Sequence, residues 1–141
     1  MTNRSLLTIV KDQHPLVLHH TQTIQCACIA MCQRRTGSVL VVDEHDHLCG
    51  IFTGRDAVRV LSSGLIDGCS LPLSAAMTPS PVTITPNACA IDALRIMSDG
   101  GFRHVPVVEG GRIWGIVSRS DFLGTEIERL DEDEQLAQCI W

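Results

Sequence analysis

Two stretches of the sequence decide the fold: GIFTGRD at residues 50–56 and GIVSRSD at residues 115–121. They align when the chain is shifted by 65 residues. Just upstream, a shift of 66 residues aligns VLVVD at residues 39–43 with VPVVE at residues 105–109. One residue is therefore lost in the intervening turn. The pattern continues in order over nearly the whole chain, which indicates an internal repeat.

Each copy predicts the same order of elements in about 50 residues: strand, helix, strand, strand, helix. Short strands are expected at residues 16–18 and 82–84. The helix that follows is indicated by apolar residues at helical spacing, which in the first copy are Ile24, Ala27, Cys28 and Met31. In the second copy the matching residues are Ala90, Ala93, Leu94 and Met97.

A hairpin follows the first helix of each copy, formed by residues 39–42 with 48–53 and by residues 105–108 with 113–118. Gly110-Gly111 favours a tight turn in the second hairpin, because such turns need positive φ. A second helix is expected after each hairpin.

A unit of this size buries little surface alone, so the copies need each other. We therefore expect an α+β fold whose two copies pack as a pseudo-twofold sandwich. Residues 1–64 hold the first copy with its N-terminal segment, and residues 65–129 hold the second. Residues 130–141 form an acidic C-terminal tail or helix extension.

Composition narrows the function. The 141 residues carry a net charge of −5, which argues against a nucleic-acid partner, and 45% of them are hydrophobic, which favours a packed core. No apolar run is long enough for a membrane helix. No export signal is evident, and the seven cysteines are an odd number without a disulfide framework. A reduced, cytoplasmic chain is the expectation.

The layout resembles a tandem pair of CBS domains, named for cystathionine β-synthase, over roughly residues 5–125. Both opening stretches fit the family's Gly-apolar-apolar-[Ser/Thr]-x-x-Asp signature, and HVPVV at residues 104–108 fits its Pro-Val-Val strand. The resemblance implies a regulatory module and not an enzyme. It also implies a homodimer, an unknown effector protein and an adenosine-containing ligand. AMP, ADP, ATP, NAD(H) and S-adenosylmethionine are the candidates, and no cofactor is required.

By that resemblance, Asp56 and Asp121 accept hydrogen bonds from ribose hydroxyls, and Thr53 and Ser118 contact the ribose or a phosphate. A carboxylate suits both ribose hydroxyls because it only accepts. A hydroxyl at a helix start lies beside unpaired N–H groups that favour phosphate. The residues implied to wall the base are Pro15, Leu16, Val39, Ile51, Pro81, Val82, Val105 and Ile116.

The two sites are not equivalent in charge. The second copy places Arg103 and His104 before its strand and Arg119 beside its aspartate, whereas the first copy retains Arg55. Phosphate oxygens bind strongly to such cations. The second copy therefore offers more cationic side chains to a phosphate than the first copy does.

A simpler interpretation stays open. Thr53 with Asp56, and Ser118 with Asp121, also have the spacing of capping boxes, which serve only the helix. The chain would then be a ligand-free, dimerising interaction platform.

Other signals are weaker. Cys26, Cys28 and Cys32 suggest packing more than metal or redox sensing, because no Cys-x-x-Cys pair supports zinc. His45 and His47 lie in an acidic turn that reads as a solvated hairpin tip, so no metal site is predicted. The tail leaves an apolar stripe that suggests either a dimer partner or fraying. Its members are Leu123, Ile127, Leu130, Ala137, Ile140 and Trp141.

Overall fold

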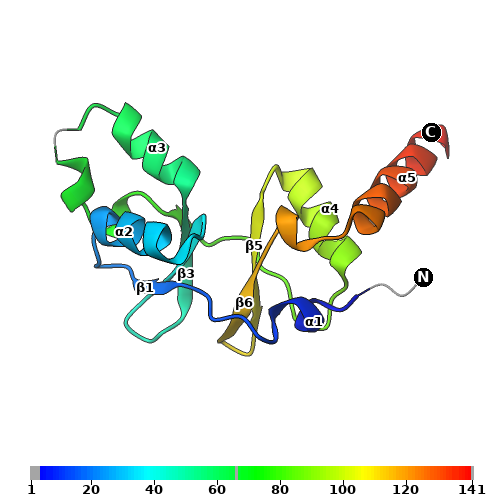
Figure 1. Cartoon of the computed structure of the whole chain (residues 1–141), viewed down its shortest axis with the longest axis horizontal. Coiled ribbons are helices and arrows are strands. Elements are labelled where there is room, and N and C mark those ends of the chain that lie inside the picture. The colour runs from blue at the N-terminus through cyan, green and yellow to red at the C-terminus, as the bar shows by residue number, and fades with distance from the viewer. Residues whose placement is uncertain (1–3, 66, 141) are drawn as a thin grey trace. The chain divides into compact units, whose positions relative to one another are not determined.

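The computed structural model describes residues 4–65 and 67–140, with side chains described through residue 136. The chain is mixed α+β, as predicted, and forms two compact units (Figure 1). The first-copy unit holds residues 14–81. The second-copy unit combines residues 4–13 with residues 82–140. The packing of one copy against the other stays a prediction.

The first-copy unit is built on a four-stranded sheet in the order β1-β2-β3-β4. Strand β1 (Val17–His19) runs parallel to β2 (Ser38–Val42), and β2 pairs antiparallel with β3 (Leu48–Thr53). Strand β4 (Thr78–Pro79) adds to β3. Its helices are α2 (Ile24–Arg34), α3 (Gly54–Ser62) and the 3₁₀ turns η1 (Gly68–Ser70) and η2 (Leu73–Ala75).

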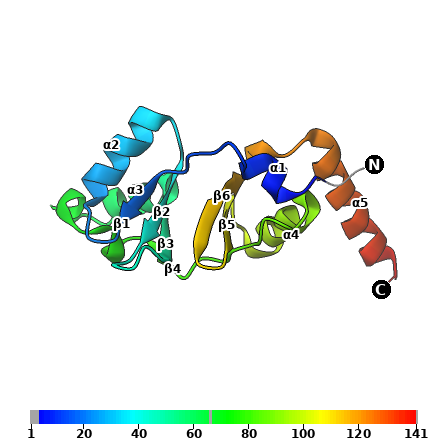
Figure 2. The ribbon, with the colours of Figure 1, turned by 90° about the horizontal axis from the view of Figure 1, so that it is seen from below.

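The second-copy unit contains the antiparallel pair β5 (His104–Glu109) and β6 (Arg112–Ser118) (Figure 2). Helix α4 (Ala90–Gly100) covers it, and helix α5 (Gly124–Ile140) packs against α4. A short helix α1 (Leu6–Val10) lies against β6. The 3₁₀ turn η3 (Arg119–Asp121) joins β6 to the segment before α5.

The helical spacing predicted the core faces correctly. In α2, Ile24, Ala27 and Met31 are buried. In α4 all four residues of the predicted apolar stripe are buried. They pack with Val105, Val107 and Val117 in one core cluster. The aliphatic core therefore forms because each helix turns its apolar stripe towards a β-branched strand. The members of that stripe are Ala90, Ala93, Leu94 and Met97.

Both hairpins are confirmed. Gly110 and Gly111 have φ values of 58° and 76°, so the tight turn does use positive φ at both positions. Two elements differ from expectation. The strand expected at residues 82–84 reduces to a single parallel bridge between Ile84 and Val107. The second helix of the second copy does not start directly after Ser118, because η3 and an extended residue precede α5.

The segment that precedes each copy in the sequence packs in the unit of the other copy. Residues 4–13 pack in the second-copy unit, and residues 71–79 pack in the first-copy unit. Gly50 and Gly115, the first residues of the two signature stretches, allow these segments to approach the strands closely. A Cβ atom on Gly115 would lie 2.8 Å from Val10 Cβ, and one on Gly50 would lie 2.3 Å from Met77 Sδ. The boundary between the sequence copies at residues 64 and 65 stays a prediction, whereas the compact units divide at residues 13/14 and 81/82.

The acidic tail forms part of helix α5, and its apolar stripe is partly used within the unit. Leu130 is 2% exposed and Ile127 packs against the same core. Arg95 on α4 binds Asp133 on α5 at 2.9 Å. Leu123 stays exposed, and the side chains of residues 137–141 lie outside the described part, so the dimer role stays a prediction. Of the helices described, none is both long and apolar enough to cross a membrane.

Candidate ligand site

Strand register decides which predicted site residues share a face. His104 pairs with Ser118 and Pro106 pairs with Ile116, and cross-strand partners lie on the same face of a sheet. The first copy repeats this arrangement. Its matching pairs are Ser38 with Thr53 and Leu40 with Ile51. Thr53 and Ser118 each lie at the end of a strand, β3 and β6. In both units their side chains are on the sheet face that points away from the unit's own core cluster.

The same register places two predicted residues on the opposite face. Val39 pairs with Phe52, Val105 pairs with Val117, and both valines are fully buried in their core clusters. Neither valine therefore presents an exposed surface to a base in this structure. Leu40 and Pro106 are not among the predicted wall residues, but the two-residue period of a strand places them on the face of Thr53 and Ser118.

Asp121 is held at the end of β6 by a capping box. Its Oδ2 accepts hydrogen bonds from Ser118 N at 2.7 Å and from Ser118 Oγ at 3.2 Å. Among the residues that the structure describes, none donates to Oδ1. The side chain is only half-buried. The capping interpretation is therefore confirmed as local geometry, and one carboxylate oxygen stays available.

Asp56 closes the equivalent box in the first copy, but it is more fully engaged. Its Oδ2 accepts from Thr53 N at 2.9 Å and from Thr53 Oγ1 at 3.2 Å. Its Oδ1 accepts from Arg59 Nη1 at 3.1 Å, and the residue is 3% exposed. The shift of 65 residues places Gly124 where the first copy has Arg59. The two aspartates are therefore equivalent in sequence but not in availability.

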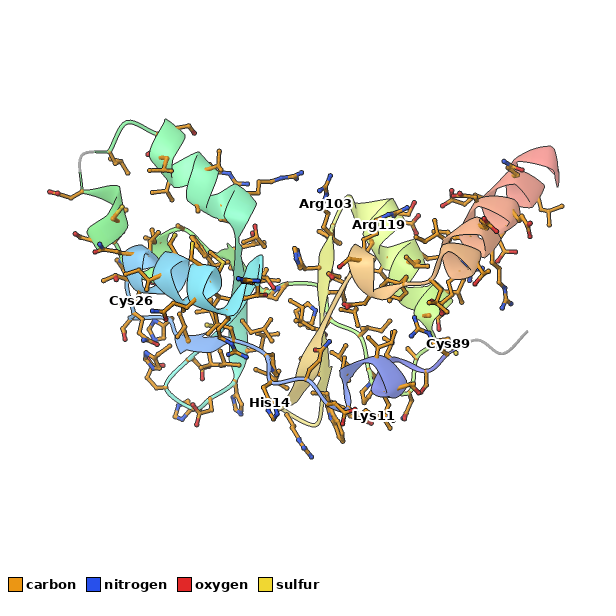
Figure 3. All side chains as sticks on the ribbon, in the orientation of Figure 1. Lys11, His14, Cys26, Cys89, Arg103 and Arg119 are labelled. Atoms are coloured by element: carbon orange, nitrogen blue, oxygen red, sulfur yellow. The ribbon has the colours of Figure 1, made fainter. Side chains whose placement is uncertain are left out.

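Positive charge gathers beside Asp121. Arg103 immediately precedes β5 and Arg119 immediately follows β6, and Arg119 N donates to the Arg103 carbonyl at 3.2 Å. Figure 3 shows both side chains at this end of the hairpin. Both residues are exposed, so their guanidinium groups are free to meet an anion.

His104 is the half-buried member of this group. Burial lowers the pKa of His104 below its ordinary value of 6.5, nearby Asp121 opposes that shift, and Arg103 adds to it. The neutral imidazole is therefore the favoured form at neutral pH, and it offers one donor and one acceptor.

The other predicted contacts are spread over both units. Arg55 is exposed on α3, and Ile51 is 7% exposed on β3. Pro15 and Leu16 are half-buried before β1, and the Leu16 carbonyl accepts from Leu40 N at 2.9 Å. In the second half of the chain, Ile116 and Pro81 are half-buried and Val82 is 47% exposed.

Among the described side chains, those of residues 4–65 and 67–136, no three His, Cys, Asp or Glu gather as a metal site requires. The described cysteines are free thiols, and burial raises the pKa of Cys28, with Cys69 and Cys32 nearby. At the hairpin tip, Asp43 Oδ1 accepts from the amides of His45 and His47, which lowers the pKa of Asp43. The Asp43 carboxylate therefore caps the backbone amides of its own turn.

Comparison with known proteins identifies the family. The CBS domain family matches this chain twice, at residues 9–63 and 73–127. The chain belongs to the CBS domain family, as a tandem pair. It is 35% identical over 126 residues to the CBS domain-containing protein CBSCBSPB1 of Arabidopsis thaliana. That alignment covers 89% of this chain and 23% of the plant protein, so the chain spans about a quarter of that relative's length.

Solved structures agree on the fold. A CBS-domain containing protein from Agrobacterium tumefaciens is 33% identical, with a TM-score of 0.75 over 82% of this chain and 86% of that one. A CBS domain protein from Pyrobaculum aerophilum, complexed with AMP, gives 20% identity and a TM-score of 0.82 over 92% and 99%. The CBS domain pair of protein MJ0100, in complex with 5-methylthioadenosine and S-adenosyl-L-methionine, gives 25% and 0.76 over 90% and 98%.

Proposed function

We propose that this chain is a regulatory module whose second copy binds a phosphorylated adenosine such as AMP, and that it acts through its dimer or an effector protein. One observation carries the proposal: Asp121 presents a carboxylate oxygen without a partner among the described residues, beside His104, Arg103 and Arg119. The CBS pairs solved with AMP and with S-adenosylmethionine make an adenosine ligand the natural class.

The carboxylate supports recognition of the ribose. Its Oδ2 is fixed by the Ser118 amide, so its Oδ1 has a defined direction before any ligand arrives. A preorganised acceptor binds a hydroxyl donor without first paying the entropy of ordering its own side chain. The Ser118 hydroxyl, which donates to Asp121 Oδ2 at 3.2 Å and contacts Ser120 Oγ at 2.8 Å, is an additional polar group beside the carboxylate.

The charges support a phosphate on that ribose. Two exposed guanidinium groups attract an anion, and the neutral His104 can donate one further hydrogen bond. The two guanidinium groups repel the sulfonium cation of S-adenosylmethionine. Of the adenosine ligands, those with phosphate therefore suit the second copy best.

A ligand-free platform is the second candidate, and the two complete capping boxes favour it. Melting temperatures across AMP, ADP, ATP, NAD, NADH and S-adenosylmethionine separate the two. A ligand at about 100 times its Kd adds about 2.7 kcal/mol, which for a chain of this size raises the melting temperature by roughly 5–12 °C. A rise with a phosphorylated adenosine supports the sensor. No rise with any of the six would overturn it and favour the platform.

A further inference from the structure

The turn that carries Asp121 lacks a support that its first-copy counterpart has. Asp56 opens the nine-residue helix α3, in which backbone carbonyls bond to amides four residues on. The 3₁₀ turn η3 stops at Asp121, and Phe122 is extended, with φ −98° and ψ 145°. The Asp121 carbonyl therefore has no continuing helix to supply its donor, which must come from another part of the protein or from solvent.

Arg4 supplies that partner from the far end of the sequence. Its Nη2 donates to the Asp121 carbonyl at 3.0 Å. The same guanidinium binds both carboxylate oxygens of Glu126, with Nη2 to Oε1 at 2.7 Å and Nε to Oε2 at 3.2 Å. The fork geometry of arginine makes three such bonds possible at once.

Both ends of this contact are themselves anchored. The Arg4 carbonyl accepts from Ala90 N at 2.8 Å, and Ser5 bridges Cys89 at the start of α4. Glu126 Oε1 also accepts from Leu123 N at 2.8 Å, and its side chain is 13% exposed. The hydrogen bonds with Arg4 lower the pKa of Glu126 and raise that of Arg4, as expected of a charge-assisted pair.

We propose that Arg4 is a positioning residue of the second-copy ligand site, holding the Ser118–Asp121 turn through the Asp121 carbonyl and Glu126. This inference rests on the proposed function. Because Asp121 is assigned to the ribose, Arg4 acts on the nucleoside part of the ligand and not on its phosphate. The site thereby depends on the N-terminal segment, which no sequence motif marks.

Calorimetry with adenosine and with AMP tests this role. Arg4→Gln should weaken binding of both ligands about tenfold and by the same factor, as loss of a charged hydrogen-bonded contact does. Arg95→Gln is the matched control, because Arg95 also ties α5 through an ion pair, at 2.9 Å to Asp133, but does not contact the Asp121 turn. The control should keep wild-type affinity for both.

The outcomes separate cleanly. A lower melting temperature with unchanged affinity in Arg4→Gln would show a purely structural role and overturn the proposal. A loss confined to AMP would show direct phosphate contact and also overturn it. If Arg4→Gln fails to fold, Arg4→Lys keeps the charge without the fork and should still lose affinity for both ligands; full affinity would contradict the proposal. Wild-type protein that binds neither ligand would instead remove the proposed function, and this inference with it.

Discussion

Arg59 Nη1 donates to Asp56 Oδ1 at 3.1 Å, whereas Oδ1 of the equivalent aspartate, Asp121, has no donor among the described residues. The contact follows from one sequence difference, because the residue at the place of Arg59 in the second copy is Gly124. A ligand ribose at Asp56 would have to displace this pair, whereas one at Asp121 would displace no contact of Oδ1. We therefore expect one occupied ligand site per chain.

Removing Arg59 tests that asymmetry. Arg59→Ala should cost about 1–3 kcal/mol, because the arginine is exposed but its removal takes a donor from the buried Asp56 carboxylate. The variant should also gain AMP binding at the first copy, because Asp56 Oδ1 loses its donor. Calorimetric stoichiometry measures this. An unchanged single equivalent would show that Arg59 is not what closes the first site.

The close approach at Gly115 predicts a second effect. Gly115→Val should destabilise the second-copy unit by about 1–3 kcal/mol, as overpacking does. The reason is that even a Cβ atom there would lie 2.6 Å from Gln13 Oε1 and 2.8 Å from Val10 Cβ. Urea unfolding measures the loss. Gly124→Ala is the control, since nothing lies within 4 Å of a Cβ atom at that position. Equal stability of the two variants would contradict the packing described for residues 4–13.

His104 predicts a pH dependence of stability. Its pKa is lowered in the folded protein, so the unfolded chain binds more protons as the pH falls below 6.5. Stability contributed by the neutral imidazole is therefore present above pH 6.5 and declines below it. His104→Gln should flatten the change in unfolding free energy between pH 7.5 and about 5.5. His45→Gln, at the exposed hairpin tip, should keep the wild-type slope. A wild-type slope in His104→Gln would exclude this histidine as the source.

The charges around the site predict a split between ligands. Arg119→Ala should weaken AMP binding by roughly 10- to 150-fold and leave adenosine binding unchanged, because a guanidinium contact with phosphate is worth about 1.5–3 kcal/mol. Arg112→Ala is the control, since Arg112 lies at the other end of the hairpin, 4.2 Å from the Trp114 ring centroid. Calorimetry with both ligands makes the comparison. An equal loss for adenosine and AMP in Arg119→Ala would place Arg119 away from the phosphate.

The repeat made the elements predictable, because helices and hairpins leave strong periodic signals. Ala90, Leu94 and Met97 lie where their spacing placed them, and Gly110-Gly111 forms the expected turn. Single positions near a helix boundary were harder. The η3 turn separates Ser118 from α5, and nothing in SRSDF at residues 118–122 marks the break.

The candidate site was predictable only where it is local. The Ser118–Asp121 box follows from spacing, but the wall residues depend on strand register, and a shift of one residue exchanges the two faces. That is why Val39 and Val105 lie in the cores while Leu40 and Pro106 share the face of the hydroxyl residues. The Arg4–Glu126 contact joins residues 122 positions apart, and no local pattern predicts such a pair.

The most direct measurement of the central claim compares AMP titrations of Asp121→Asn and Asp56→Asn with the wild type by calorimetry. Each variant keeps an amide oxygen that can accept the capping hydrogen bond, so both should fold. We expect wild type and Asp56→Asn to bind one equivalent of AMP. Asp121→Asn should bind AMP at least tenfold more weakly, since hydrogen bonds to a charged group are lost. Wild-type affinity in Asp121→Asn, or a loss confined to Asp56→Asn, would contradict it.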